Sequence, residues 1–127
     1  MTWVLAIDDS PGRYDEFARL LDRERSDLAL VVACHPEVVE ALLATGKVRA
    51  ILLDRDMPYQ DGEVWAEYIA NHPIPTIITS CTGHPTARET MLATLRSGGV
   101  CAIACYADHQ GCETEWLWWI RGVTGVR

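Results

Sequence analysis

Short apolar runs alternate with longer amphipathic segments along the whole chain, and this alternation constrains the fold more than any other feature. The runs cover residues 4–7, 28–33, 50–53, 76–79 and 100–104. Most are rich in β-branched residues and lack polar alternation, which is typical of strands buried on both faces. Strands that alternate with helices form a parallel sheet with helices on both sides. The pattern therefore predicts an α/β fold of the (βα)5 type.

The segments between these runs carry apolar residues at helical spacing, namely Tyr14, Phe17, Ala18 and Leu21 in the first segment and Trp65, Tyr68 and Ile69 in the third. Pro11 and Pro36 predict helix starts. Asp61 is expected to cap the third helix, and residues 86–89 match a capping box that opens the fourth. A last helix is expected over residues 114–122. Right-handed crossovers then favour a doubly wound sheet with the strand order 2-1-3-4-5.

The composition is that of one compact, acidic domain. The 127 residues include 11 lysines and arginines against 18 aspartates and glutamates, and 49% of them are hydrophobic. The net charge of −7 repels phosphate backbones, so direct binding of nucleic acid is not expected. No apolar stretch reaches the roughly 20 residues of a membrane span, and the first residues lack the basic region of a signal peptide. We therefore expect a single domain over residues 1–127, with no further domain attached, in the cytoplasm.

Carboxylates follow two strands that are neighbours in this order. Asp8 and Asp9 come directly after the first strand, and Asp54 follows the third. In an open α/β sheet, ligands bind beyond the carboxyl ends of the strands, near the point where the strand order reverses. Carboxylates gathered there repel one another, and a divalent cation such as Mg²⁺ removes the repulsion. The alternative is that each acid is a helix cap or a solvated loop residue, which explains the three together less well.

The motif D-x-D-M-P-x-x-D-G over residues 54–62, the acidic pair after the first strand and residues 75–80 resemble response-regulator receiver domains, over nearly the whole chain. The resemblance implies a flavodoxin-like, three-layer fold in which Asp54 is the phospho-acceptor and the Ser80 hydroxyl contacts the phosphoryl group. It also implies the Mg²⁺ ligands, which are Asp8, Asp9, Asp54 and the backbone carbonyl of Asp56. The implied partner is a histidine kinase or a phosphotransfer protein.

Two departures from the receiver pattern concern the fifth strand. Receivers carry a lysine at its end that pairs with the phosphoryl oxygens, whereas the single lysine here is Lys47, and Cys105 or a neighbour takes that position. Ala102 falls near the position of the aromatic switch residue of receivers. Loss of the lysine removes an electrostatic contribution that is usually a large part of phosphoryl transfer. Arg55 and Arg88 are candidates to replace it.

The chain also resembles, in part, a receiver-like family proposed to process cyclic phosphates. The shared residues are the pattern Asp8-Asp9-x-x-x-Arg13-x-x-x-Phe17, the Leu-Asp-x-Asp ending of the third strand, and Ile78-Thr79-Ser80 followed by Met91, Leu95 and Gly98. That family usually has histidine where this chain has Arg55 and Thr79. Three hypotheses therefore stay open: a phosphorylation-dependent signalling module, a metal-dependent domain that processes or binds a cyclic or nucleotide phosphate, and a pseudo-receiver that binds a partner without phosphorylation.

Several cysteines and histidines are further candidates for chemistry. The group suggestive of zinc is Cys101, Cys105, His109 and Cys112, but cysteines four residues apart on one strand lie about 13 Å apart, too far for one tetrahedral ion. We expect reduced thiols that act as small core residues. His84 is a candidate acid or base near a bound phosphate. Cys81 has no activating partner in the sequence, so a catalytic thiol is not expected.

The last helix carries tryptophans on two sides. At 100° per residue, Trp116, Trp119 and Ile120 share one face, while Trp118 points roughly opposite to Trp116. The first face is expected to pack on the sheet, which leaves Trp118 exposed in a monomer. Exposed aromatic residues often mark interfaces, and in receivers the fourth helix, fifth strand and fifth helix commonly form the dimer face. We expect a homodimer contact at Trp118; the alternative is a lone exposed tryptophan.

Overall fold

The computed structural model describes residues 1–24, 26–54, 60–79, 85–104 and 112–126. Five strands form one sheet: β1 (Thr2–Ile7), β2 (Leu28–Ala33), β3 (Val48–Leu53), β4 (Thr76–Ile78) and β5 (Ala102–Ala104). All neighbouring strands are parallel, and their order is β2-β1-β3-β4-β5. The (βα)5 architecture and the strand order predicted from the sequence are confirmed.

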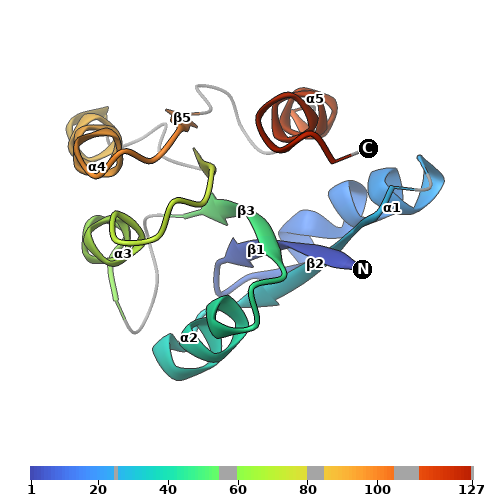
Figure 1. Ribbon diagram of the computed structural model, residues 1–127, viewed down its shortest axis with the longest axis horizontal. Helices are drawn as coiled ribbons and strands as arrows, with labels where there is room; N and C mark the ends of the chain where they lie inside the picture. The colour runs from blue at the N-terminus through green and yellow to red at the C-terminus, as the bar shows by residue number, and fades with distance from the viewer. Residues whose placement is uncertain (25, 55–59, 80–84, 105–111, 127) are drawn as a thin grey trace.

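Helices cover both faces of the sheet, as Figure 1 shows. They are the 3-10 helix η1 (Pro11–Tyr14) and the α-helices α1 (Asp15–Arg23), α2 (Pro36–Ala44), α3 (Gly62–Ile69), α4 (Pro85–Ser97) and α5 (Glu113–Thr124). α1 and α5 pack on one face, and α2, α3 and α4 pack on the other. In this three-layer, flavodoxin-like arrangement, the carboxyl ends of all the strands lie at the same edge of the sheet.

Alternate residues of the central strands enter two separate cores, because successive side chains of a strand point to opposite faces. The buried side chains facing α2, α3 and α4 include Leu5, Ile7, Ile51, Leu53 and Ile78. Those facing α1 and α5 include Val4, Ala6, Ala50, Leu52 and Ile77. Both faces of each strand therefore need apolar side chains, which explains the unbroken apolar runs in the sequence.

The first helical segment differs from the predicted apolar stripe. η1 is a 3-10 helix, and the α-helix starts only at Asp15. A 3-10 turn has three residues per turn, so the 3.6-residue spacing does not continue from Tyr14 into α1. Tyr14, Phe17 and Leu21 are buried as predicted, but Ala18 is exposed and Leu20 is buried instead. The prediction for Ala18 was therefore wrong.

The sequence predicted the first residues of the helices better than it predicted their capping residues. Pro36 opens α2, and Asp61 lies at the N-cap of α3. The Asp61 side chain makes no capping hydrogen bond, but its carbonyl oxygen accepts hydrogen bonds from two amides of the first turn. α4 begins at Pro85, so Thr86 lies inside the helix and the capping box predicted at residues 86–89 was wrong. A proline fits the first turn of a helix, and here it moves the start ahead of Thr86.

Gly98 lies where the end of α4 meets the end of α3. A Cβ atom at this position would lie 2.5 Å from the carbonyl oxygen of Ala70, which belongs to the backbone and cannot rotate away. Gly98→Ala is therefore expected to lower the free energy of unfolding by about 1 to 3 kcal/mol, measured by urea denaturation. Gly122→Ala in α5 is the matched control, because nothing lies within 4 Å of its added Cβ. The control should raise stability by roughly 0.5 to 1 kcal/mol, and a similar gain for Gly98→Ala would contradict the prediction.

Candidate functional site

The backbone places three polar residues directly beyond the carboxyl ends of neighbouring strands. The amide of Asp8 donates to the carbonyl of Ala33 (3.2 Å), and the amide of Asp54 donates to that of Ile7 (3.2 Å). The amide of Thr79 donates to the carbonyl of Leu53 (2.8 Å). The hydrogen-bond ladder of the parallel sheet thus extends one residue past β1, β3 and β4. Asp8, Asp54 and Thr79 are all buried, at 1%, 1% and 0% exposure.

The three aspartates predicted to converge do lie together. One carboxylate oxygen from each of Asp8, Asp9 and Asp54 lies within 4.8 Å of the other two, and Asp9 is the exposed member. Oxygens bound to one Mg²⁺ ion lie about 2.9 Å apart when adjacent and about 4.2 Å apart when opposite, so small side-chain movements would bring these three oxygens onto one ion. Three carboxylates are hard oxygen donors of the kind that Mg²⁺ and Ca²⁺ prefer. The donor set therefore fits a divalent cation.

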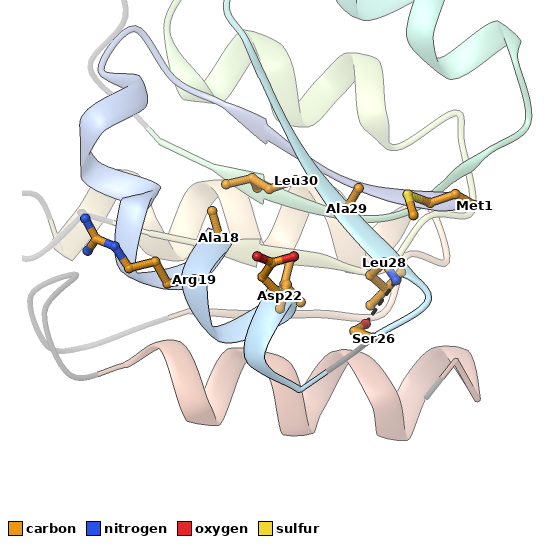
Figure 2. Close-up of a pocket in the computed structure, with 9 residues that line it drawn as sticks. Met1, Ala18, Arg19, Asp22, Ser26, Leu28, Ala29 and Leu30 are labelled. Atoms are coloured by element: carbon orange, nitrogen blue, oxygen red, sulfur yellow. Dashed lines mark hydrogen bonds between the residues drawn. The ribbon is translucent and has the colours of Figure 1, made fainter.

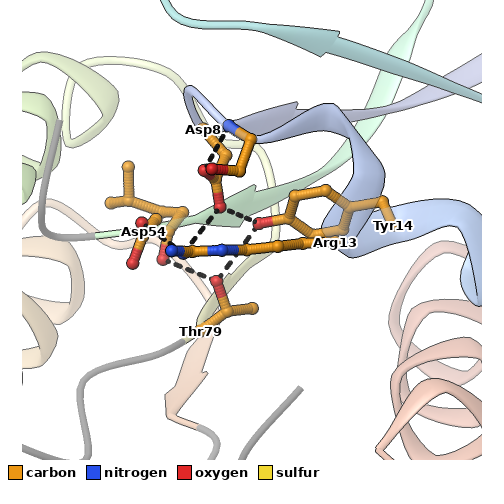
Figure 3. Close-up of polar contacts among 7 residues, drawn as sticks. Asp8, Arg13, Tyr14, Asp54 and Thr79 are labelled. Atoms are coloured by element: carbon orange, nitrogen blue, oxygen red, sulfur yellow. Dashed lines mark hydrogen bonds and ion pairs between the residues drawn. The ribbon is translucent and has the colours of Figure 1, made fainter. Parts of the chain in front are cut away.

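A guanidinium group from η1 enters the same cluster. The Arg13 Nη1 atom lies 3.1 Å from Asp54 Oδ2 and 3.7 Å from Asp8 Oδ2, which Figure 3 shows as a bridge between the two carboxylates. Both aspartate side chains are buried, whereas the Arg13 side chain is 44% exposed. Arg13 therefore neutralises part of the negative charge of the cluster from its solvent side.

Tyr14 holds Asp8 from the protein interior. Its hydroxyl donates to Asp8 Oδ2 at 2.7 Å and lies 3.5 Å from Thr79 Oγ1 (Figure 3). The backbone amide of Ser10 donates to the other oxygen, Asp8 Oδ1, at 2.9 Å. Thr79 Oγ1 donates to the carbonyl of Leu53 at 3.3 Å. Both oxygens of Asp8 thus have donors, which fixes the orientation of this carboxylate.

Burial dominates the ionisation of this pair. Desolvation raises the pKa of Asp8 above its ordinary value of 3.8, although the hydrogen bonds from Tyr14 and Ser10 and the charge of Arg13 oppose the shift. Burial, followed by the charge of Asp8, raises the pKa of Tyr14 well above 10.0. The phenol therefore keeps its proton at neutral pH and stays a hydrogen-bond donor to the carboxylate.

Comparison with solved structures identifies the fold. The response regulator domain of Thermotoga maritima CheB matches with a TM-score of 0.72 and 22% identity, covering 100% of this chain and 98% of that one. The BeF3-activated receiver domain of Klebsiella pneumoniae RstA matches at 0.71 and 17%, over 94% and 99% of the two chains. A two-component response regulator from Clostridium difficile matches at 0.73 and 15%, over 97% and 95%. The chain has the receiver fold.

Sequence comparison finds a relative over a smaller part of the chain than structural comparison does. No family model matches the chain. A protein-glutamate methylesterase/protein-glutamine glutaminase of Rhodopseudomonas palustris is 32% identical over 98 residues, which are 76% of this chain. This chain spans only 27% of the length of that protein, so the activities in its name describe a much longer molecule.

Several residues predicted for the site lie outside the described part of the receiver fold. They are Arg55, Asp56, Ser80, Cys81, His84, Cys105 and His109. Lys47 is among the described residues and directly precedes β3, so it lies at the edge of the sheet opposite the acids. Its Nζ lies 5.6 Å from the centre of the Trp3 ring. Arg88 lies in the first half of α4, and Ala102 is buried on β5.

The cysteines correct one expectation. Cys101 was predicted to be a core residue but is exposed, because it lies one residue before β5 begins. Cys34 and Cys112 are half-buried free thiols. Among the described residues, only the three aspartates form a group of acids, histidines or cysteines placed to share a metal ion. Zinc is therefore not proposed.

The sequence did not reveal how Arg13 and Tyr14 join the acids of the receiver fold. Both lie on η1, a turn whose geometry follows neither helical nor strand periodicity. Pro11 and Gly12, which favour a tight turn directly after the acidic pair, are the features that point to it. Thr79 was named from the sequence only as part of a motif and was given no role, although a polar residue directly after a buried strand is a candidate site residue.

A groove of about 420 Å³ lies away from this cluster, between α1 and β2, as Figure 2 shows. Leu28, Ala29 and Leu30 line it from the first half of β2, whereas the acids follow the carboxyl ends of the strands. Arg19 and Asp22 give it one charge of each sign. The groove is therefore separate from the acidic site. Among the described residues, no helix is both long and apolar enough to cross a membrane.

Proposed function

We propose that this chain is a receiver domain in which Asp54 accepts a phosphoryl group with the help of Mg²⁺. The observation that carries the proposal is the position of Asp54: it is buried at the carboxyl end of β3, with oxygens of Asp8 and Asp9 within 4.8 Å. Backbone hydrogen bonds hold the residues that follow β1 and β3, so the backbone of Asp8 and Asp54 is fixed in place. The receiver fold of the structural relatives adds support.

In this proposal, an oxygen of Asp54 attacks the phosphorus of a donor. A P–O or P–N bond of the donor breaks, the leaving group departs with the electron pair, and an acyl phosphate forms on Asp54. Asp8, Asp9, Asp54 and the Asp56 carbonyl would hold Mg²⁺, which would neutralise charge on the transferring group. Ser80 is proposed to contact the phosphoryl oxygens, and His84 to act as an acid or base nearby. The proposed donor is a histidine kinase or a phosphotransfer protein.

Acetyl phosphate tests the proposal without a kinase. Wild-type protein with Mg²⁺ should gain the mass of one phosphoryl group, whereas Asp54→Asn should gain none, because an amide is not a nucleophile of this kind. Asp61→Asn is the matched control, since it removes an exposed carboxylate at the start of α3 and should leave the gain unchanged. A gain that persists in Asp54→Asn would place the acceptor elsewhere. No gain in wild type, with Mg²⁺ shown to bind, would reject the phospho-acceptor function.

A metal-dependent action on a cyclic or nucleotide phosphate is a second candidate. The observation that favours it is the guanidinium of Arg13 beside the acids, since arginine beside a metal site suits a phosphate diester. Incubation with cyclic nucleotides and Mg²⁺, followed by chromatography, separates the two functions. Hydrolysis that Asp8→Asn abolishes would support the second candidate. If neither phosphorylation nor hydrolysis occurs, the pseudo-receiver hypothesis is favoured.

We also propose that the chain forms a weak homodimer through α5. Trp118 is 71% exposed, as the helical geometry predicted, while Trp116 is buried and Trp119 is half-buried. Burial of one such ring contributes a few kcal/mol at about 25 cal/mol per Å² before association entropy is subtracted, enough for a weak dimer only. Sedimentation equilibrium at tens of micromolar should show a dimer that Trp118→Ala weakens at least several-fold. A strictly monomeric wild type at that concentration would reject the homodimer.

A further inference from the structure

Within the part of the chain that the structure describes, one cation of the protein itself pairs with the acids of the site, and it comes from an unexpected element. The single lysine of the chain, Lys47, packs over Trp3 at the opposite edge of the sheet and cannot reach Asp54. Ala104, the last described residue of β5, is apolar. Among the described residues, only Arg13 forms an ion pair with Asp8 or Asp54. A positive charge therefore reaches Asp54 from η1, after β1.

We propose that Arg13 pairs with the phosphoryl oxygens carried by Asp54 and so takes the role for which the receiver resemblance implies a lysine on the fifth strand. This inference rests on the proposed phospho-acceptor function. Arg13 Nη1 already lies 3.1 Å from Asp54 Oδ2, so a group attached to that carboxylate falls within reach of the guanidinium. Its planar fork of N–H donors pairs with two phosphoryl oxygens at once.

The local structure holds the backbone of Arg13 and leaves much of its side chain exposed to solvent. The Arg13 amide donates to the Ser10 carbonyl at 3.1 Å, closing the 3-10 turn. The next residue, Tyr14, is fully buried and packs near the Trp116 ring, which anchors the turn to the core beneath α5. The Arg13 side chain is 44% exposed. A small shift toward solvent therefore brings the guanidinium from the carboxylate to the phosphoryl group without displacing the turn.

Arg13 and a divalent cation must influence each other, because both neutralise the same oxygens. Asp8 Oδ2 and Asp54 Oδ2 each face the guanidinium, and their carboxylates also belong to the cluster that fits a metal ion. A neighbouring positive charge weakens the binding of another cation. Removal of Arg13 should therefore leave Mg²⁺ binding unchanged or strengthen it, while it slows phosphoryl transfer. If the substitution only damaged the structure of the site, Mg²⁺ binding would weaken and phosphoryl transfer would slow together.

The test compares Arg13→Ala, Arg13→Lys and the control Arg19→Ala. Arg19 is an exposed arginine of α1 that pairs with Glu16, so its removal changes the net charge equally without touching the acids. The rate of phosphorylation by acetyl phosphate is followed by intact mass at saturating Mg²⁺, and Mg²⁺ affinity by tryptophan fluorescence. We expect Arg13→Ala to be at least about tenfold slower and to bind Mg²⁺ equally or up to several-fold more tightly. Arg13→Lys should be intermediate in rate, and Arg19→Ala should match wild type.

Two results overturn the inference alone. One is a phosphorylated wild type with Arg13→Ala and Arg19→Ala reacting at the same rate. The other is a parallel loss of rate and Mg²⁺ affinity in Arg13→Ala, which would show damage to the fold of the site. A wild type that binds Mg²⁺ but gains no phosphoryl group overturns the proposed function, and this inference with it.

Discussion

Trp116→Ala is expected to lower the free energy of unfolding by about 3 to 5 kcal/mol, a large fraction of the stability of a typical domain. Trp116 is 2% exposed, and its ring centre lies 5.6 Å from that of Phe17 and 6.3 Å from that of Tyr14. Its removal leaves a cavity between α1 and α5 that these aromatic rings cannot fill without moving their helices. The same cavity should loosen Tyr14, which holds Asp8.

Trp118→Ala is the matched control for this substitution. It removes the same side chain from the same helix two residues later, but the ring is 71% exposed. Its effect should stay within about 0.5 kcal/mol. Urea denaturation followed by circular dichroism at low micromolar concentration, where a weak dimer dissociates, measures both variants. Equal losses for the two would show that the packing of α5 described above is wrong.

Asp8→Asn is expected to weaken Mg²⁺ binding by at least about tenfold, since even the hydrogen-bond partners of metal ligands typically contribute 10- to 100-fold. Asp8 supplies one of three clustered carboxylates and is held on both oxygens by Ser10 and Tyr14. Calorimetric titration measures the affinity. Asp22→Asn, which removes an exposed carboxylate on α1, is the control and should bind Mg²⁺ as wild type does. Unchanged affinity in Asp8→Asn would exclude Asp8 as a ligand.

The same substitution should act in the opposite direction on stability when a chelator removes divalent ions. Burial raises the pKa of Asp8 above 3.8, so the folded protein holds this proton more tightly than the unfolded chain does. Stability contributed by the protonated form is therefore lost as the pH rises through the folded pKa. Asp8→Asn cannot ionise, so it should be more stable than wild type at neutral pH and equal to it well below pH 3.8. A variant that is less stable at neutral pH would contradict this sign.

The sequence predicted the parts of the structure that depend on periodicity and strand order. Buried strands give unbroken apolar runs, and the order of a doubly wound sheet brings the residues after β1 and β3 together, so Asp8 and Asp54 could be paired from the sequence alone. Trp118 was placed correctly because α5 is a regular helix. These features need only local geometry and topology.

The remaining site residues depend on irregular backbone, for which the sequence has no period. Arg13 and Tyr14 reach the acids because η1 is a tight 3-10 turn, and Ala18 was placed wrongly for the same reason. Thr86 was taken as a helix cap because the residue type fits, but Pro85 already belongs to the helix. In each case the local backbone conformation decided where the side chain lies.

The sheet has unequal halves, and this affects how the molecule opens. β1 pairs with β2 over six residues and with β3 along nearly all of its length, whereas β3, β4 and β5 are joined over three described residues at each pairing. Amide hydrogens of β1 should therefore exchange with solvent only on global unfolding, while those of β5 can exchange through smaller openings. Asp8 directly follows β1 and so belongs to the slowly exchanging half. The β5 edge of the sheet can thus open without dismantling the strand end that holds Asp8.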